Sequence, residues 1–187
     1  MANEEYYYFV ASLPSLSYGD IPPKSSEAFR EDCINMLDPD DAKLIDYCVY
    51  DPKLAVSMEE VSTGSPFVDK FLTRERVLML NLAFLRAEKL GWPAPAEPPL
   101  DMPRTAAVAR AAFELDDPLE ATLNIDRQRW STLDSAVDLT DVFGVSNIYI
   151  HYLKLQLLER KQVYDAEKGL ANYKDCYNAI QDIYYSK

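Results

Sequence analysis

A chain of 187 residues is long enough to bury a substantial core and short enough for one domain, or one domain with an extended arm. Its formal net charge of −12 argues against nucleic acids and anionic membrane surfaces as partners. No stretch approaches the roughly 18–20 consecutive apolar residues of a membrane span. The acidic start Met-Ala-Asn-Glu-Glu lacks the basic segment of a signal peptide, so we expect a cytoplasmic protein.

The acidic charge is concentrated at the beginning of the chain. Residues 1–60 hold 13 acidic and 4 basic side chains, whereas residues 127–187 hold 8 of each. The simpler interpretation is that this charge keeps the protein soluble. The alternative interpretation is a docking surface for a basic partner.

The first predicted element covers residues 6–13, which are mostly aromatic and apolar. Their propensity favours a strand, but so short a run does not distinguish a strand from a buried helical turn. A loop over residues 15–24 follows. Ser25 or Ser26 is then expected to cap a helix of about ten residues.

Three aspartates surround a proline at the expected start of a second helix: Asp38, Asp40 and Asp41. We expect Asp38 to cap this helix, with Asp40 and Asp41 near the positive end of its dipole. The alternative is a helical magnesium-dependent enzyme that uses these carboxylates. Prenyl-transferring enzymes of that class carry aspartates four residues apart on one helix face, whereas this spacing scatters them around the first turn. We therefore expect no metal site here, nor at Asp116-Asp117.

A longer helical pattern runs from Phe67 to Leu90. It has a start signal at Ser65-Pro66 and an expected C-terminal cap at Gly91, after which Trp92-Pro93 forbids continuation. Charged residues are expected on its solvent-facing side: Arg74, Glu75, Arg76, Arg86 and Glu88.

A proline-rich connector over residues 92–103 holds five of the twelve prolines and is the best candidate boundary in the chain. It separates an acidic helical part, residues 1–91, from a C-terminal helical part, residues 104–187. We expect the two parts to form one structural domain.

Two further helices are predicted after the connector. A short alanine-rich helix covers Thr105 to Glu114. A second begins at Asp117-Pro118, where the aspartate is the expected cap, and runs towards Leu133. Whether that helix breaks near residues 124–126 is left open.

The last predicted element is a long helix from Ser146 to Tyr185. Ser146 is the expected cap. Apolar residues recur at steps of three and four along the whole length, and all faces are apolar between Ile148 and Leu158. The pattern leaves open whether Gly169 interrupts the helix. The prediction is an all-α fold of six or seven helices with a long C-terminal helix.

Catalytic signals are weak. His151 is the single histidine, which excludes a multi-histidine metal site, and its apolar neighbours favour a core position over a general base. The three cysteines, Cys33, Cys48 and Cys176, have no metal-ligand spacing and are expected to be reduced and buried. We expect no catalytic residue, cofactor or metal.

Three tyrosines on the distal half of the final helix are the candidate protein-binding residues: Tyr173, Tyr177 and Tyr184. Tyrosine combines a large ring with a polar tip, which suits an interface. The alternative, that they pack against the earlier helices of the chain, carries equal weight.

The sequence resembles a family of short bacterial proteins whose genes lie among those of V-type ATPase subunits. The resemblance is carried by residues 7–16 (Tyr-Tyr-Phe-Val-Ala-Ser-Leu-Pro-Ser-Leu), Pro22-Pro23 and residues 26–29. It continues in residues 152–160 (Tyr-Leu-Lys-Leu-Gln-Leu-Leu-Glu-Arg) and residues 165–169. It touches both ends of the chain and leaves the middle unmatched.

This resemblance implies a role like that of the C subunit of V-type ATPases, which is called d in eukaryotes. That protein is an all-helical, non-catalytic adaptor between the central shaft and the membrane rotor ring of an ion-transporting complex. The implied partners are other ATPase subunits, and the implied location is the cytoplasmic side of the inner membrane. The C subunits are longer and built from repeated helical units, so a peripheral or assembly component is the alternative. A free-standing helical interaction module, a dimer through the long helix, is a further hypothesis.

Overall fold

The computed structural model describes residues 6–57, 62–93, 95, 102–164 and 166–185. These residues form α-helices and connecting loops without any strand, which confirms the all-α prediction. The helices are α1 (Tyr7–Ser12), α2 (Ser26–Met36), α3 (Pro39–Leu44), α4 (Pro52–Ser57), α5 (Pro66–Leu90), α6 (Pro103–Phe113), α7 (Pro118–Ala136), α8 (Val145–Val163) and α9 (Ala166–Tyr185), with a 3₁₀ turn, η2 (Ile45–Tyr47), after α3. In this part of the chain, no helix combines the length and the apolar character needed to cross a bilayer.

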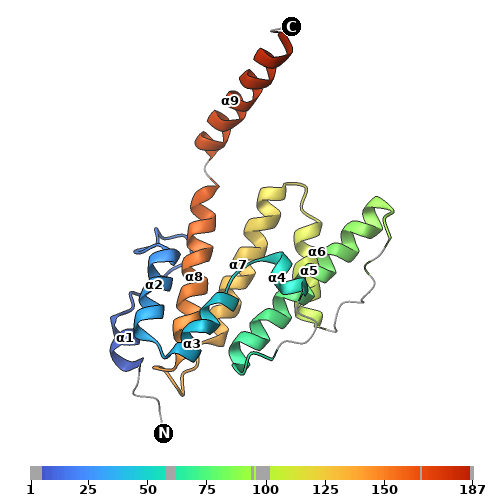
Figure 1. The fold of residues 1–187 in the computed structure, drawn as a ribbon. Helices are drawn as coiled ribbons and strands as arrows, with labels where there is room; N and C mark the ends of the chain where they lie inside the picture. Colours follow the sequence, from blue (N-terminus) through green and yellow to red (C-terminus); the bar gives the residue numbers. More distant parts are fainter. Residues whose placement is uncertain (1–5, 58–61, 94, 96–101, 165, 186–187) are drawn as a thin grey trace.

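The main helices lie side by side in a row (Figure 1). Helix α5 packs on α6, α6 on α7, α7 on α8 and α8 on α2, while α4 packs on α5. One hydrophobic cluster joins the N-terminal helices, α5, α7 and α8. Residues from both sides of the proline-rich connector therefore share one core; most of the connector itself lies outside the described residues.

Helix α8 is the centre of this core. Ile148, Tyr149, Leu153, Leu155 and Leu157 are all fully buried. They point in several directions from the helix axis, so α8 must be covered on more than one side. The dense apolar run of the sequence thus forms the helix around which the others pack.

The N-terminal segment is helical rather than extended. The sequence left a strand and a buried helical turn open for residues 6–13, and the structure has the short helix α1 there, in which Phe9 is buried against Phe29 of α2. Burial of aromatic rings stabilises either conformation, and here no neighbouring strand among the described residues offers backbone pairing. Ser25 caps α2, as one of the two expected serines, by accepting a hydrogen bond from the Ala28 amide at 3.2 Å.

Two predicted side-chain caps are wrong. Asp38 occupies the N-cap position of α3, but its carboxylate accepts no amide hydrogen bond there. Helix α8 begins at Val145, one residue before the predicted cap, so Ser146 lies inside the helix and Gly144 precedes it. In contrast, Ser65 caps α5 and Asp117 caps α7, as predicted.

Helix α5 ends as predicted, at Gly91, whose positive φ of 64° suits a residue without a side chain. Its polar side is partly mispredicted. Glu75 is only 4% exposed and Arg76 only 8%, so these two charged residues belong to the interior. Helix α7 continues through residues 124–126 without a break.

The predicted single C-terminal helix is two helices. Helix α8 ends at Val163, and Tyr164 leaves the helical conformation with φ −83° and ψ 66°. Gly169 is not the interruption, because it lies inside α9. The additional break, together with the short helices α1 and α4, gives more helices than the six or seven predicted.

Candidate functional site

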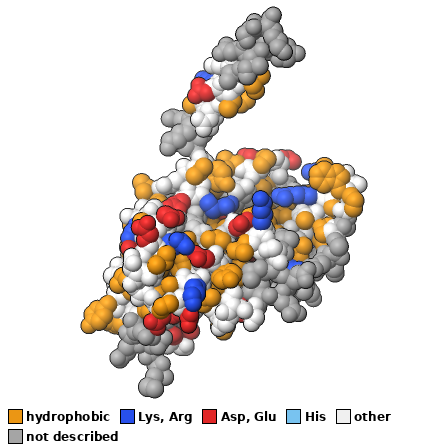
Figure 2. All heavy atoms as spheres, in the orientation of Figure 1, with side chains coloured by type: hydrophobic (Ala, Val, Ile, Leu, Met, Phe, Trp, Pro, Cys, Tyr) orange, Lys and Arg blue, Asp and Glu red, His pale blue; other side chains and the backbone are white. Residues whose placement is uncertain are grey.

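Helix α9 is the part of the described structure that lacks packing partners. It projects from the body of the molecule (Figure 1) and makes no extensive contact with any other element. Every side chain described in α9 is exposed to solvent. Figure 2 shows hydrophobic side chains on the surface of this arm. The site therefore consists of a helix face that no other described residue covers.

The exposed apolar residues of α9 form one stripe. Leu170 is 55% exposed, Tyr173 65%, Tyr177 50% and Ile180 63%. We call these four residues the α9 stripe. Their steps of three, four and three residues are those of the seam of a left-handed coiled coil. The stripe therefore has a spacing that suits packing against another helix.

The two central tyrosines contact each other. The rings of Tyr173 and Tyr177 stack with 6.2 Å between centroids, and the Tyr177 hydroxyl accepts a hydrogen bond from Gln181 Nε2 at 3.1 Å. Two of the three tyrosines predicted for a protein-binding face thus share one exposed surface. The side chain of Tyr184, the third, lies outside the described residues.

The exposure of the stripe affects the stability of α9 itself. Most helical stability in proteins comes from tertiary packing of an apolar face, and α9 has no such packing among the described residues. Gly169 weakens it further, by about 1 kcal/mol relative to alanine. A partner helix on the α9 stripe would supply the missing packing.

The acidic cluster at the start of α3 does not converge. Asp40 forms an ion pair with Lys43 at 2.9 Å, which lowers the pKa of the aspartate through the hydrogen bond and the charge of the lysine. Asp41 accepts a hydrogen bond of 2.6 Å from the Tyr6 hydroxyl, and Asp38 is exposed. Across the described residues, no group of three or more acidic, histidine or cysteine side chains is placed to hold a metal ion.

The other acidic candidates have structural roles. Asp117 accepts a hydrogen bond from the Leu119 amide at 2.8 Å, whereas the neighbouring Asp116 is exposed. In the N-terminal third, Asp32 pairs with Lys24, and Asp46 pairs with Arg30 at 2.6 Å. Three of the four basic residues of this third are thus paired, and its 13 acidic side chains still outnumber them.

His151 and two cysteines belong to the core region. His151 is half-buried on α8, with its ring centroid 5.0 Å from that of Phe29. Burial, with a smaller contribution from Lys154, lowers its pKa to about 4, so it is neutral at physiological pH. Cys33 and Cys48 are buried as predicted, but Cys176 is exposed on α9.

Sequence reasoning missed a buried network of charges. Arg129 of α7 contacts Glu75 of α5, with 3.1 Å from Nε to Oε1, and Asp126, with 2.9 Å from Nη1 to Oδ1. Arg160 of α8 reaches the other oxygen of Asp126 at 3.2 Å. Burial lowers the pKa of Arg129, but the charge and hydrogen bonds of Glu75 outweigh that effect and raise it.

This network joins three helices and has the properties of a structural element. Its carboxylates are occupied by guanidinium groups, and the cavity that Glu75 and Arg129 line is only about 10 Å³, too small for a substrate. In the sequence, the only sign of this network was the spacing of three residues between Asp126 and Arg129, which places both on one face of α7. Their partners lie 54 and 34 positions away in the sequence, which no local pattern reveals.

Comparison of the chain with protein-family models, with curated proteins and with solved structures finds no match in any of the three. The choice of the α9 stripe as the candidate functional site therefore depends on its geometry alone.

Proposed function

We propose that this protein is a non-catalytic adaptor of a V-type ATPase, similar in role to the C subunit, that connects the central shaft to the membrane rotor ring. The helical body packs against one partner, and α9 docks on a helix of another. Force passes between them through packed surfaces, so the role requires neither a cofactor nor a catalytic residue.

The observation that carries the proposal is the uncovered α9 stripe. Tyr173 and Tyr177 lie at its centre and are at least half exposed. Aromatic residues at the centre of an interface commonly account for much of its binding energy. The coiled-coil spacing favours a helical partner, and the central shaft of a rotary ATPase is such a partner.

The reason for proposing this complex is the resemblance of both chain ends to proteins encoded with V-type ATPase subunits. Residues 152–160 of that resemblance lie on α8, at the centre of the core, and residues 166–169 lie in the first turn of α9. The proposal places the protein on the cytoplasmic side of the membrane, held there through the complex. The acidic N-terminal third is its second docking face.

The direct test is a tagged pull-down from the membrane fraction of the native host, read by mass spectrometry. The proposal predicts recovery of ring and shaft subunits in amounts comparable to the tagged protein. Recovery of no ATPase subunit, with the protein entirely in the soluble fraction, would contradict it.

A second candidate function is self-association through α9 in a free-standing interaction module. The same coiled-coil spacing favours it, and the mixture of acidic and basic residues in α9 gives a second copy little electrostatic repulsion. Sedimentation equilibrium distinguishes the candidates. The adaptor is expected to be a monomer well above micromolar concentration, whereas a dimer that the double substitution Tyr173→Ser, Tyr177→Ser dissociates would favour the module.

A further inference from the structure

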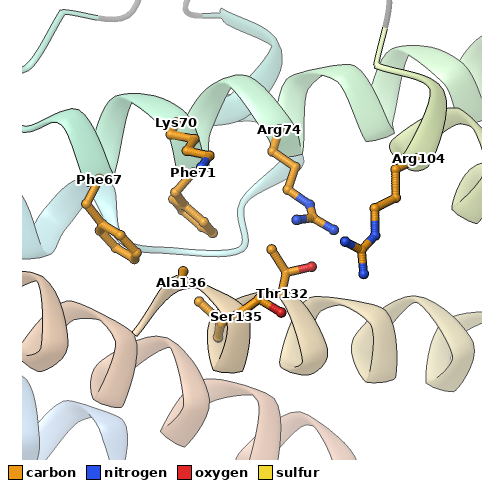
Figure 3. A pocket seen from close by; sticks show the side chains of 9 residues that line it. Phe67, Lys70, Phe71, Arg74, Arg104, Thr132, Ser135 and Ala136 are labelled. Atoms are coloured by element: carbon orange, nitrogen blue, oxygen red, sulfur yellow. The ribbon is translucent and has the colours of Figure 1, made fainter. Parts of the chain in front are cut away.

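A cavity of about 290 Å³ lies between α5, α6 and α7, and none of its described lining residues belongs to α9. Figure 3 shows it from close by. Its size is at the lower end of the range for small-molecule sites. The described residues that line it are Phe67, Lys70, Phe71, Arg74, Arg104, Thr132, Leu133, Ser135 and Ala136.

The lining combines three cations with apolar side chains, and none of these lining residues is acidic. Lys70 and Arg74 come from α5 and Arg104 from α6. Within the described part of the chain, these three have no carboxylate partner, whereas Arg30, Arg129 and Arg160 are all paired. Three cations thus line one cavity, and no carboxylate is among its described lining residues.

The two arginines point toward the same space. Figure 3 shows their guanidinium groups next to each other, above Thr132 of α7. Burial lowers the pKa of Arg74, and the like charge of Arg104 lowers it further, although neighbouring Glu75 opposes this. An anion between the two groups would relieve this repulsion and bind guanidinium donors that have no carboxylate partner among the described residues.

The other residues that line the cavity indicate what the uncharged part of a ligand contacts. Phe67, Phe71 and Leu133 offer an apolar surface beside the cations. The hydroxyls of Thr132 and Ser135 already donate to carbonyl oxygens one turn earlier in α7, each at 2.8 Å. The arginines are therefore the principal donors for the charged group, and the rings contact the organic part.

We propose that this cavity binds a small organic anion, a phosphate monoester with an apolar or aromatic group. The phosphate lies between Arg74 and Arg104, with Lys70 nearby, and the organic group lies against Phe67 and Phe71. This site is separate from the α9 stripe and does not depend on the adaptor function.

The test is calorimetric titration of the full chain with phenyl phosphate, inorganic phosphate and benzyl alcohol at physiological salt, with ¹H–¹⁵N NMR to locate binding. We expect phenyl phosphate to bind most tightly, because it alone uses both the cations and the rings. Its amide shifts are expected in α5, around Phe71, and in α7, around Thr132. Absence of saturable binding, or shifts elsewhere, would overturn the proposal.

Matched variants separate this site from general attraction to positive charge. Arg74→Gln and Arg104→Gln are each expected to weaken binding about tenfold or more, because each removes a charged hydrogen-bond donor. Arg86 is an exposed residue of α5 outside the cavity, and Arg86→Gln is expected to leave the affinity for phenyl phosphate unchanged. Because Arg104 is exposed, we expect Arg104→Gln to keep the fold even if Arg74→Gln destabilises the protein. Equal binding by all three variants would refute the site.

Discussion

Helices α8 and α9 follow each other in the chain and have nearly equal lengths, 19 and 20 residues, yet their surroundings are opposite. Both carry apolar residues at helical spacing. In α8 these residues are buried on several sides, whereas in α9 the described side chains are all exposed. Periodicity thus identifies the apolar face of a helix but not what covers it. For α8 the cover is the protein itself, and for α9 we propose that it is another protein.

The comparison predicts that charges around α8 are essential to the body, while charges on α9 are not. Arg129→Met leaves Glu75 and Asp126 buried without their partner, and we expect a loss of about 3–5 kcal/mol in the free energy of unfolding. Lys174→Met on α9 is the matched control, with a change within about 0.5 kcal/mol. Urea denaturation measures both, and similar losses would contradict the distinction.

Equivalent leucine truncations sharpen the comparison. Leu153→Ala in α8 removes a fully buried side chain and is expected to cost about 2–5 kcal/mol. Leu170→Ala in α9 removes a side chain that is already 55% exposed, and is expected to change global stability by less than about 0.5 kcal/mol. A large effect at Leu170 would show that α9 packs on the body in solution.

The half-buried histidine of α8 makes stability depend on pH. The pKa of His151 is about 4 in the folded protein and has an ordinary value of 6.5 when exposed. The unfolded chain therefore binds more protons between these values, so this part of the stability is present above pH 6.5 and is lost as pH falls towards 4.

His151→Gln isolates this effect from the titration of carboxylates. The stability of the wild type should fall relative to that of the variant by about 1–3 kcal/mol between pH 7 and pH 4. Denaturation curves at several pH values measure the difference. Parallel pH profiles for the two proteins would mean that His151 is not buried as a neutral group.

Two glycine substitutions should act in opposite directions. Gly91→Ala forces a side chain into the positive φ that ends α5, and is expected to cost about 1 kcal/mol of global stability. Gly169→Ala lies inside α9 with no atom near the new methyl group, and is expected to favour that helix by about 1 kcal/mol. Circular dichroism should show the second as increased helicity without a change in the body's unfolding midpoint.

Local signals predicted the fold class and several helix ends. Ser65 and Gly91 bound α5, and Asp117 starts α7, because caps and turn conformations depend on nearby residues. The end of α8 at Tyr164 could not be predicted, because neither glycine nor proline stands there. The burial of Glu75 depends on Arg129, 54 positions later, so its helix alone suggested an exposed side chain.

The sequence could predict which residues of the candidate site share a helix face, but not whether that face is exposed. The stripe spacing placed Tyr173 and Tyr177 on one face of a helix, and the structure confirms that shared face. Whether the chain itself would cover them depended on the position of α9 relative to the body, which no local pattern determines. The cavity with Arg74 and Arg104 was not predicted at all, since it forms only where three separate helices meet.

The most direct test of the adaptor proposal is a quantitative pull-down from the native membrane fraction with matched α9 variants. Tyr173→Ser with Tyr177→Ser alters the stripe, whereas Asp175→Ser with Asn178→Ser alters the polar side of the same helix. We expect the first pair to reduce recovery of ATPase subunits about tenfold or more, as loss of central interface tyrosines commonly does, and the second pair to leave it unchanged. Equal recovery with both pairs, from proteins that remain folded, would contradict the proposed role of α9.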